Sequence, residues 1–396
     1  MLSETSAATV RATLPAVGGA IGDISSLFYG KLFADHPVLL RDLFNRGHQV
    51  TGEQPQALAG SIAIFATALL DHPDQRPDAM LARIAHRHVS LGITADQYQV
   101  VHDYLFASIV EVLGAAVTPE VAAAWDEVYW LMANALIAIE SNLYQQAEAH
   151  GGAAAREYRV VARRQETADV VTFFVAPVDG APLPAAQPGQ YVSVQVQLPD
   201  GARQIRQYSL SGQASGALRF SVKRNADDPA GEVSNHLHDH VHEGDVLRVS
   251  APFGDVVLDE RSQRPVVLVS AGIGNTPMTG ILSHLAATGS TRRVIALHAD
   301  RDEASHAFRT ELADAAGRLG DFQAHTWYER PKGAWPAERT GLMNLSGVEI
   351  PADSVVYLCG PLPFMRAVRE QLLGLGVAAA DIHYEVFGPD LWHGQN

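Results

Sequence analysis

The hydrophobic pattern of this chain changes twice along its length, and these changes limit what the chain can fold into. From about Pro15 to Ala149, apolar residues recur at three- and four-residue spacing, which is typical of amphipathic helices. From Glu157 to about Pro252, short β-branched runs alternate with turn signals. From Arg264 onward, all-apolar strands alternate with helical stretches. We therefore expect three successive structural parts.

The first part is expected to be all-α, and the second to be a small antiparallel β-barrel with one helix that begins near Gly231. The barrel strands are expected at Tyr158–Ala162, Val170–Val175, Tyr191–Leu198, Gln207–Leu210, Leu218–Lys223 and Val246–Ser250. The third part is expected to be a doubly wound parallel sheet. Its strands are expected at Val266–Ser270, Arg293–His298 and Val355–Cys359, with helices at Pro277–Ala287 and Phe308–Leu319.

Domain boundaries are expected after residues 150 and 262, which gives domains 1–150, 151–262 and 263–396. The first boundary falls in Gly151-Gly152-Ala153-Ala154-Ala155, a stretch of small residues that contributes nothing to a core. A chain of 396 residues with 47% hydrophobic and 18% charged residues suits two or three globular domains. We therefore expect a multidomain protein of globular type.

Charge, cysteine content and apolar runs narrow the possible partners and the location. A net charge of -15 argues against nucleic acid or an anionic membrane as the main partner. Met1–Val10 lacks the basic cluster of a secretory signal, and the apolar run Val128–Ile139 is too short to span a bilayer. The single cysteine, Cys359, excludes an internal disulfide and a thiolate metal cluster. We expect a cytoplasmic protein without a transmembrane segment.

A glycine turn follows the first apolar strand of the third part. Glycines let a backbone approach a pyrophosphate closely, and the helix that follows offers free N–H donors at its start. Proline, which replaces the third glycine of a dinucleotide fingerprint here, is tolerated at a helix start. The order strand, turn, helix predicts a nucleotide site, and a tight turn without a ligand is the alternative. The candidate residues are Gly272, Ile273, Gly274, Asn275, Thr276 and Pro277.

Two more segments belong to the same expected sheet. Tyr357-Leu358-Cys359-Gly360-Pro361 ends a strand at the carboxyl edge, where ligands of open α/β sheets bind. The chain then closes with Glu385, Val386, Phe387, Gly388 and Pro389, in which a carboxylate beside an aromatic ring could handle protons at a redox cofactor. The alternative is a terminal strand with its phenylalanine in the core.

The strand Arg206-Gln207-Tyr208-Ser209-Leu210 carries an unusual set of polar side chains. A planar guanidinium suits a pyrophosphate, a tyrosine ring can stack, and a serine hydroxyl acts at short reach. Together these groups suit a flavin dinucleotide, whereas an ordinary edge strand with a salt-bridging arginine would carry them as well. On five residues alone, both interpretations stay open.

Taken together, these motifs resemble the ferredoxin-NADP reductase superfamily. The resemblance also includes Gly189-Gln190-Tyr191 and Gly231-Glu232-Val233-Ser234. It implies that Arg206, Val233 and Ser234 hold the FAD pyrophosphate, that Tyr191 and Tyr208 pack on FAD, and that Ser209 lies near the reactive flavin nitrogen. It also implies that Phe387 covers the ring where nicotinamide enters.

In the helical part, His88 shares an apolar stripe with Leu81, Ile84 and Leu91, at steps of three and four residues. A histidine on such a face is more often a satisfied core residue than a ligand, but an iron–histidine bond to haem would also explain it. Glu140 lies one turn beyond Leu136 on an apolar helical face, where a carboxylate needs a partner.

The helical part resembles a bacterial globin, and the whole chain resembles the flavohaemoglobins, in which a globin is fused to such a reductase. The matching residues are Leu27-Phe28-Tyr29, Leu43-Phe44-Asn45, Glu53-Gln54, Leu58, Ile84 to His88, Gln97-Tyr98 and Glu140. The resemblance implies that His88 binds iron and that Tyr98 and Glu140 form a relay to its other ring nitrogen. It also implies that Tyr29 donates to dioxygen with help from Gln54, and that Phe44 and Leu58 wall the pocket.

Two departures from the family pattern affect these assignments. Arg87 stands where the family usually has lysine, which keeps the charge but could alter contact with the flavin domain. Gln54 precedes Pro55, and a residue before proline is pushed away from helical geometry. Thr51 with Gln54 could instead cap a helix that has proline in its first turn.

The resemblance implies haem b, FAD and NADH or NADPH as cofactors, and nitric oxide dioxygenation as the activity. O2, NO and NAD(P)H would be the small-molecule partners, with no nucleic acid; the oligomeric state is left open, with a monomer as one option. Two other functions stay open: a flavin reductase with another acceptor such as peroxides, and an O2 or NO sensor. Asp300 would repel a 2′-phosphate and Arg301 could bind one, so the coenzyme choice is open too.

Overall fold

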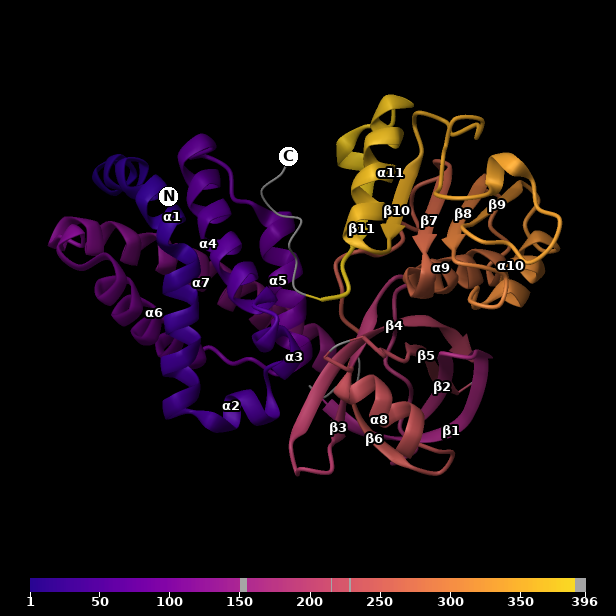
Figure 1. Cartoon of the computed structure of the whole chain (residues 1–396), viewed down its shortest axis with the longest axis horizontal. Coiled ribbons are helices and arrows are strands. Elements are labelled where there is room, and N and C mark those ends of the chain that lie inside the picture. Colours follow the sequence, from indigo (N-terminus) through magenta and orange to yellow (C-terminus); the bar gives the residue numbers. More distant parts are fainter. Residues whose placement is uncertain (150–154, 215, 228, 389–396) are drawn as a thin grey trace. The chain divides into compact units, whose positions relative to one another are not determined.

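A computed structural model describes residues 1–149, 155–214, 216–227 and 229–388 (Figure 1). Residues of the chain group into two compact units, each with most of its contacts inside itself. The first includes Met1–Ala155 and Gln195–Arg206, and the second includes Arg156–Val194 and Gln207–Gly388. Among these described residues, no helix combines the length and the apolarity that crossing a membrane requires. The boundary expected at residue 151 lies outside the described residues, and the one expected after residue 262 stays a prediction.

The helical part is all-α, as expected. Its helices are α1 (Glu4–Asp35), α2 (Pro37–Asp42), α3 (Arg46–Val50), α4 (Glu53–Asp71), α5 (Asp78–Leu91), α6 (Gln97–Leu113) and α7 (Pro119–Ala149), with a 3-10 turn at Gly114–Ala116. The first helix starts well before the expected Pro15. Ser3 caps it, because its Oγ accepts a hydrogen bond from the Ser6 amide at 3.3 Å. Pro15 lies inside the helix between the buried Val10 and Val17, whose packing offsets the missing backbone donor.

The β-rich part is a closed barrel, also as expected. Its strands run in the order β1 (Ala155–Thr167), β2 (Val170–Pro177), β5 (Ala217–Lys223), β4 (Arg203–Ala214), β3 (Tyr191–Gln197) and β6 (Val246–Ser250). Helix α8 (Glu232–His240) begins directly after Gly231, where the sequence predicts it. Phe173 and Phe220 stack inside the barrel with ring centroids 5.5 Å apart. Strands β2, β3 and β5 are buried along most of their length rather than at alternate residues.

The third part is a parallel sheet whose strands lie in the order β11 (Ile382–Glu385), β10 (Val355–Cys359), β7 (Val266–Ala271), β8 (Val294–Asp300) and β9 (Phe322–Tyr328). The helices of this part are α9 (Asn275–Ala287), α10 (Arg309–Ala316) and α11 (Leu362–Gly374). The chain moves from β7 to β8 and β9 on one side, and then crosses back to β10 and β11 on the other. The strand order therefore reverses between β7 and β10, as in a doubly wound fold.

The sequence prediction did not place β9 or α11, and it gave β11 only as an alternative. β9 lies at one edge of the sheet, and its sequence Phe-Gln-Ala-His-Thr-Trp-Tyr has polar residues at positions that are only half-buried. Such a strand lacks the all-apolar run that marks the central strands β7, β8 and β10.

Candidate functional site

The glycine turn and the end of β10 meet at the point where the strand order reverses. β7 pairs in parallel with β10, so that Ser270 and Cys359 are register partners. A Cβ atom added to Gly274 would lie 2.4 Å from the Cys359 carbonyl oxygen. Only glycine fits there, because no real Cβ atom approaches a backbone atom so closely. The structure therefore brings both predicted nucleotide segments to one carboxyl edge.

The turn itself leads into a helix start that suits an anion. Gly272 has a φ of +54° within the 3-10 turn Gly272–Gly274, and α9 begins at Asn275. The Thr276 hydroxyl donates to the Ile273 carbonyl at 3.0 Å, and the Asn275 amide donates to the Ala307 carbonyl at 2.9 Å. Pro277 lies in the first helical turn, where a proline removes no hydrogen bond. The backbone donors of this turn fit a nucleotide pyrophosphate.

The end of β11 lies beside the end of β10. Cys359 and Glu385 are register partners, and burial, with the Glu385 carboxylate adding to it, raises the pKa of the Cys359 thiol well above its usual value. The thiol is therefore no nucleophile at neutral pH. Glu385 accepts a hydrogen bond from the Val386 amide at 3.0 Å. Phe387 is 49% exposed, so it is not the core residue of the alternative interpretation; Gly388 follows it with a φ of +129°. Pro389 lies outside the described residues.

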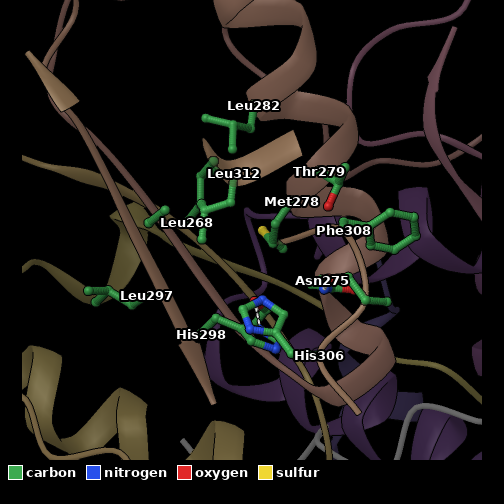
Figure 2. Close-up of a pocket in the computed structure, with 13 residues that line it drawn as sticks. Leu268, Asn275, Met278, Thr279, Leu282, Leu297, His298, His306, Phe308 and Leu312 are labelled. Carbon is green, nitrogen blue, oxygen red and sulfur yellow. Dashed lines mark hydrogen bonds between the residues drawn. The ribbon is translucent and has the colours of Figure 1, made fainter. Parts of the chain in front are cut away.

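The sequence analysis missed a buried polar cluster that is formed by this sheet and by the loop after β8. The rings of His298 and His306 lie 4.1 Å apart, and the His298 Nδ1 lies 2.9 Å from the Ser270 hydroxyl. His306 Nδ1 lies 2.9 Å from the Tyr328 hydroxyl. Burial lowers the pKa of His306 to about 2, so this ring is neutral. His298 and His306 line one end of a pocket that is also lined by Asn275 (Figure 2).

The predicted flavin strand presents its side chains within β4. The Tyr208 ring stacks on Phe220 at 5.6 Å with an interplanar angle of 24°, and Ser209 is buried. The Gln207 side-chain amide donates to the Ser193 hydroxyl at 2.9 Å. Tyr191 is buried at the start of β3. An aromatic ring and a short hydroxyl thus lie side by side in β4, and both groups suit flavin binding.

One close approach connects this strand to the predicted nucleotide helix, and another lies at the start of α8. A Cβ atom on Gly280 would lie 2.3 Å from the Leu210 carbonyl oxygen, so α9 packs directly against β4. A Cβ atom on Gly231 would lie 2.4 Å from the Ser234 hydroxyl oxygen and 2.8 Å from the Asn225 Cβ, so a side chain there would require these neighbours to shift. Val233 is fully buried in the first turn of that helix. The nucleotide helix and the flavin strand are therefore neighbours within the second unit.

Arg206 lies in the first unit, at the other half of β4. Its Nη1 donates to the Gln204 Oε1 at 3.1 Å and to the Ile205 carbonyl at 2.8 Å, and its Nη2 donates to the Asn45 Oδ1 at 2.6 Å. The guanidinium therefore contacts the segment between α2 and α3. Its assignment to the FAD pyrophosphate stays a prediction.

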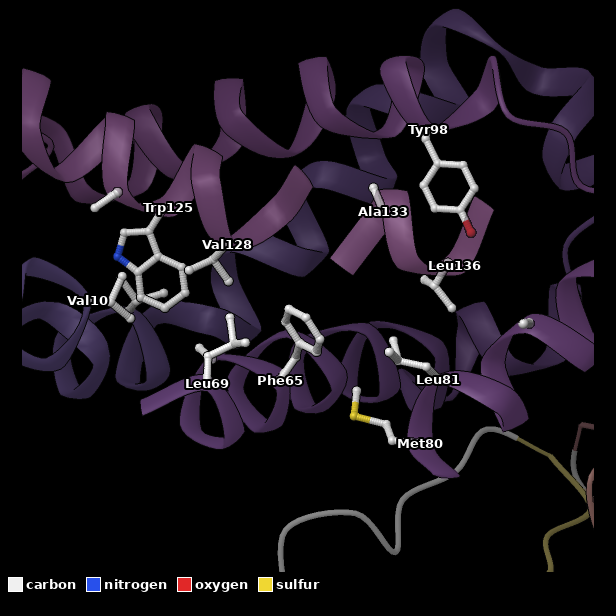
Figure 3. Close-up of a cluster of buried hydrophobic side chains, with 14 residues drawn as sticks. Val10, Phe65, Leu69, Met80, Leu81, Tyr98, Trp125, Val128, Ala133 and Leu136 are labelled. Atoms are coloured by element: carbon white, nitrogen blue, oxygen red, sulfur yellow. The ribbon is translucent and has the colours of Figure 1, made fainter. Parts of the chain in front are cut away.

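The predicted relay in the helical part has hydrogen-bonding geometry. His88 Nδ1 lies 2.8 Å from Glu140 Oε1 and 3.0 Å from the Tyr98 hydroxyl, which itself donates to Glu140 Oε1 at 2.6 Å. Glu140 is 3% exposed, and burial, followed by the Glu140 charge, raises the pKa of Tyr98. Tyr98 lies beside Leu136 at one end of the apolar cluster in Figure 3. α5, α6 and α7 each contribute one member of this relay.

His88 has one ring nitrogen that fits a metal. Its Nδ1 is occupied by the relay, and across the described residues no hydrogen bond reaches its Nε2. The side chain is 31% exposed, although its helical stripe is apolar. A satisfied core histidine would have both nitrogens buried or paired, so the geometry fits a haem ligand better.

A second group of predicted residues gathers around Tyr29. Its ring lies 5.8 Å from Phe44, edge to face, and Leu58 packs on the same apolar cluster. Burial raises the pKa of the Tyr29 phenol, while a hydrogen bond to the Gln54 side chain opposes this rise. Gln54 thus reaches Tyr29 despite Pro55, because α4 already begins at Glu53 and the proline falls in its first turn. Gly52, rather than Thr51, is the residue at the helix cap.

One histidine of this region was not singled out by the sequence. His48 lies in α3, and burial, together with the charges of Arg206 and Arg87, lowers its pKa to about 4. No local pattern marks it, because the two arginines come from distant parts of the chain. The expected role of Arg87 in contact with the flavin domain stays a prediction.

Comparisons with known proteins identify the domains at both ends of the chain. Residues 26–136 match the globin family model, and residues 268–370 match the model for an oxidoreductase NAD-binding domain. Flavohemoproteins of Chromobacterium violaceum and Rhizobium meliloti are 43% and 41% identical to this chain. The alignments cover 98% of this chain and 98% of the first protein, and 99% of this chain and 100% of the second.

Two solved structures are also similar to this chain, one over nearly its whole length and one over part of it. A flavohemoglobin of Malassezia yamatoensis, with FAD and heme bound, is 38% identical and superposes with a TM-score of 0.91. The superposition covers 98% of this chain and 100% of the Malassezia yamatoensis chain. The FAD/NAD-binding domain of a nitric oxide dioxygenase from Vibrio cholerae is 41% identical with a TM-score of 0.55, and it covers 59% of this chain and 99% of that domain.

Proposed function

Because the chain belongs to the flavohemoprotein family, we propose that it is a nitric oxide dioxygenase that converts nitric oxide and dioxygen to nitrate at the expense of NAD(P)H. It is an NAD(P)H-dependent oxidoreductase with FAD and haem as cofactors. Two molecules of nitric oxide and two of dioxygen take up the electron pair of one NAD(P)H, and two nitrate ions, NAD(P)+ and one proton result.

When bound, haem supplies the iron at which dioxygen and nitric oxide react, and FAD divides the electron pair of a hydride into single electrons. His88 would hold the iron through Nε2. Glu140 Oε1, 2.8 Å from Nδ1, fixes the orientation of the ring and makes the imidazole a stronger electron donor. A strong donor favours the activation of dioxygen over its storage, so this relay is the observation that carries the proposal.

The Tyr29 hydroxyl would act on the ligand side of the pocket. Its raised pKa keeps the phenol protonated at neutral pH, so it can donate a hydrogen bond to a ligand that gains negative charge. Gln54 orients this hydroxyl, and Phe44 and Leu58 keep the surrounding space apolar. These roles are proposed from the arrangement of the side chains around Tyr29.

In the second unit, the start of α9 would hold the nucleotide pyrophosphate, and Tyr191, Tyr208 and Ser209 would hold the flavin. Gly280 lets α9 approach the backbone of β4 at Leu210, which supports hydride transfer between neighbouring cofactor sites. The exposed Phe387 would cover the flavin until nicotinamide displaces it. We also propose a cytoplasmic location, which fits the demand for NAD(P)H and the free, buried Cys359.

The test is consumption of nitric oxide by the purified protein with NADH and dioxygen, followed with an electrode. His88→Ala should abolish the consumption, whereas His102→Ala should not, because His102 bonds Asp126 at 2.7 Å and does not belong to the relay. If nitric oxide persists with the wild-type protein while NADH is still oxidised, the chain is a flavin reductase with another acceptor, and the proposal is wrong.

A further inference from the structure

Gln204 is a fully buried polar residue near the start of β4, and it contacts the helical part of its own unit. Its side-chain nitrogen donates to the backbone carbonyls of Arg41 at 2.9 Å, Phe44 at 3.1 Å and Leu40 at 3.3 Å. The residue is 0% exposed. Because Gln195–Arg206 belongs to the same compact unit as the helices, these contacts lie inside that unit.

Two of the carbonyls that Gln204 contacts, those of Leu40 and Arg41, lie in the last turn of α2. A helix end leaves such carbonyls without backbone donors. α2 has only six residues, and its Leu39 carbonyl accepts from both the Leu43 and the Phe44 amides. The carbonyls of Leu40 and Arg41 therefore need donors from outside the helix. A helix this short does not persist without tertiary contacts, so its donor also determines where it ends.

Arg206 extends the same contact toward α3. Gln204 Oε1 accepts from the Arg206 Nη1 at 3.1 Å, and the Arg206 Nη2 donates to Asn45 Oδ1 at 2.6 Å. That Asn45 oxygen also accepts from the Gly47 amide at 3.0 Å and thereby caps α3. The side chains of β4 thus hold the chain on both sides of Phe44.

Phe44 carries this constraint to the ligand pocket. Its ring lies 5.8 Å from Tyr29 and 5.2 Å from Phe33, edge to face in both cases. A shift of the backbone at Phe44 would therefore change the packing against the Tyr29 ring. The link from Gln204 to Tyr29 runs through one backbone segment and one aromatic contact.

We propose that Gln204 is a positioning residue that holds the Leu40–Phe44 segment and thereby sets the orientation of Tyr29 in the pocket. The inference rests on the proposed function only for the role of Tyr29 toward the ligand.

The first test is amide hydrogen exchange on the full chain, with Gln204→Glu and Gln204→Met compared with the wild type. Glutamate keeps the shape but has no donor, and methionine keeps the length without charge. Exchange in residues 39–51 should become about tenfold faster, which corresponds to the loss of one net hydrogen bond, while α6 stays unchanged. Arg203→Ala is the matched control, because Arg203 donates to the Asp42 carboxylate at 3.0 Å and leaves the carbonyls in place.

The second test reads the pocket itself. In the ferrous, carbon monoxide-loaded protein, the C–O stretching band reports the hydrogen bond that the ligand receives. Both Gln204 variants should shift or split this band, and Arg203→Ala should not. Unchanged exchange in residues 39–51, an equal rise through all helices, or an unshifted band would each overturn the proposal.

The two proposals fail in different ways. If the wild-type protein does not consume nitric oxide, the proposed function is wrong, but the local exchange caused by the Gln204 variants is unaffected. If nitric oxide is consumed and the Gln204 variants behave as the wild type in both tests, only the positioning role is wrong.

Discussion

Replacement of Tyr29 by phenylalanine should make dioxygen leave the haem-loaded ferrous protein faster. The Tyr29 side chain is buried, with 6% exposed, and its raised pKa makes it a hydrogen-bond donor throughout the neutral range. A hydrogen bond to a partner with charge character contributes about 1.5–3 kcal/mol. Its loss corresponds to roughly 10- to 150-fold faster dissociation, since every 1.4 kcal/mol is a factor of ten.

The assay is stopped-flow displacement of dioxygen by carbon monoxide. Tyr104→Phe is the matched control, because Tyr104 packs on the same apolar cluster but donates to Asp35 Oδ2 at 2.8 Å on the exposed side. Its dissociation rate should equal that of the wild type. If Tyr29→Phe also shows the wild-type rate, the hydroxyl does not reach the ligand, and the reasoning from burial and geometry is refuted.

Three further outcomes are expected. Glu140→Gln should weaken each of its two relay bonds by about 1 kcal/mol and lower the iron–histidine stretching frequency in resonance Raman spectra; an unchanged frequency would remove the carboxylate from the relay. Gly274→Ala should destabilise the protein by about 1–3 kcal/mol in denaturant titrations, because the new Cβ would meet the Cys359 carbonyl, whereas Gly320→Ala has open space and should be neutral. The pKa of His306 is lowered from 6.5 to about 2, so the folded state binds fewer protons than the unfolded state and stability must fall as the pH drops below 6.5. Relative to His306→Gln, the wild type should lose about 1.4 kcal/mol per pH unit between pH 6 and 4, and parallel curves would contradict this.

Much of the fold could be predicted because its central strands have strong local patterns. β10 lies where the all-apolar run Val355–Cys359 places it, and β6 coincides with Val246–Ser250. The need of Glu140 for a partner was also visible, because a carboxylate on an apolar face is costly to bury alone. Its assignment to a relay with His88 and Tyr98, however, came from the resemblance to the flavohaemoglobins and not from local pattern.

The remaining features depend on contacts that no local pattern contains. Gln204 and Arg41 are separated by 163 residues, so nothing near Gln204 in the sequence shows that it is buried against a helix end. His48 is similar, since its lowered pKa comes from burial and from two arginines elsewhere in the chain. The close pair of His298 and His306 rings forms only when β8 is placed beside the loop that follows it. Local sequence patterns therefore do not predict which polar groups are buried against residues from distant parts of the chain.

The most direct test of the central claim is the ratio of nitrate formed to NAD(P)H oxidised during nitric oxide consumption in air-saturated buffer. If both electrons of each hydride are used to convert nitric oxide to nitrate, two nitrate ions should form for each NAD(P)H oxidised. A ratio near zero, with NAD(P)H still oxidised, would show that the electrons leave the flavin for another acceptor and would contradict the account.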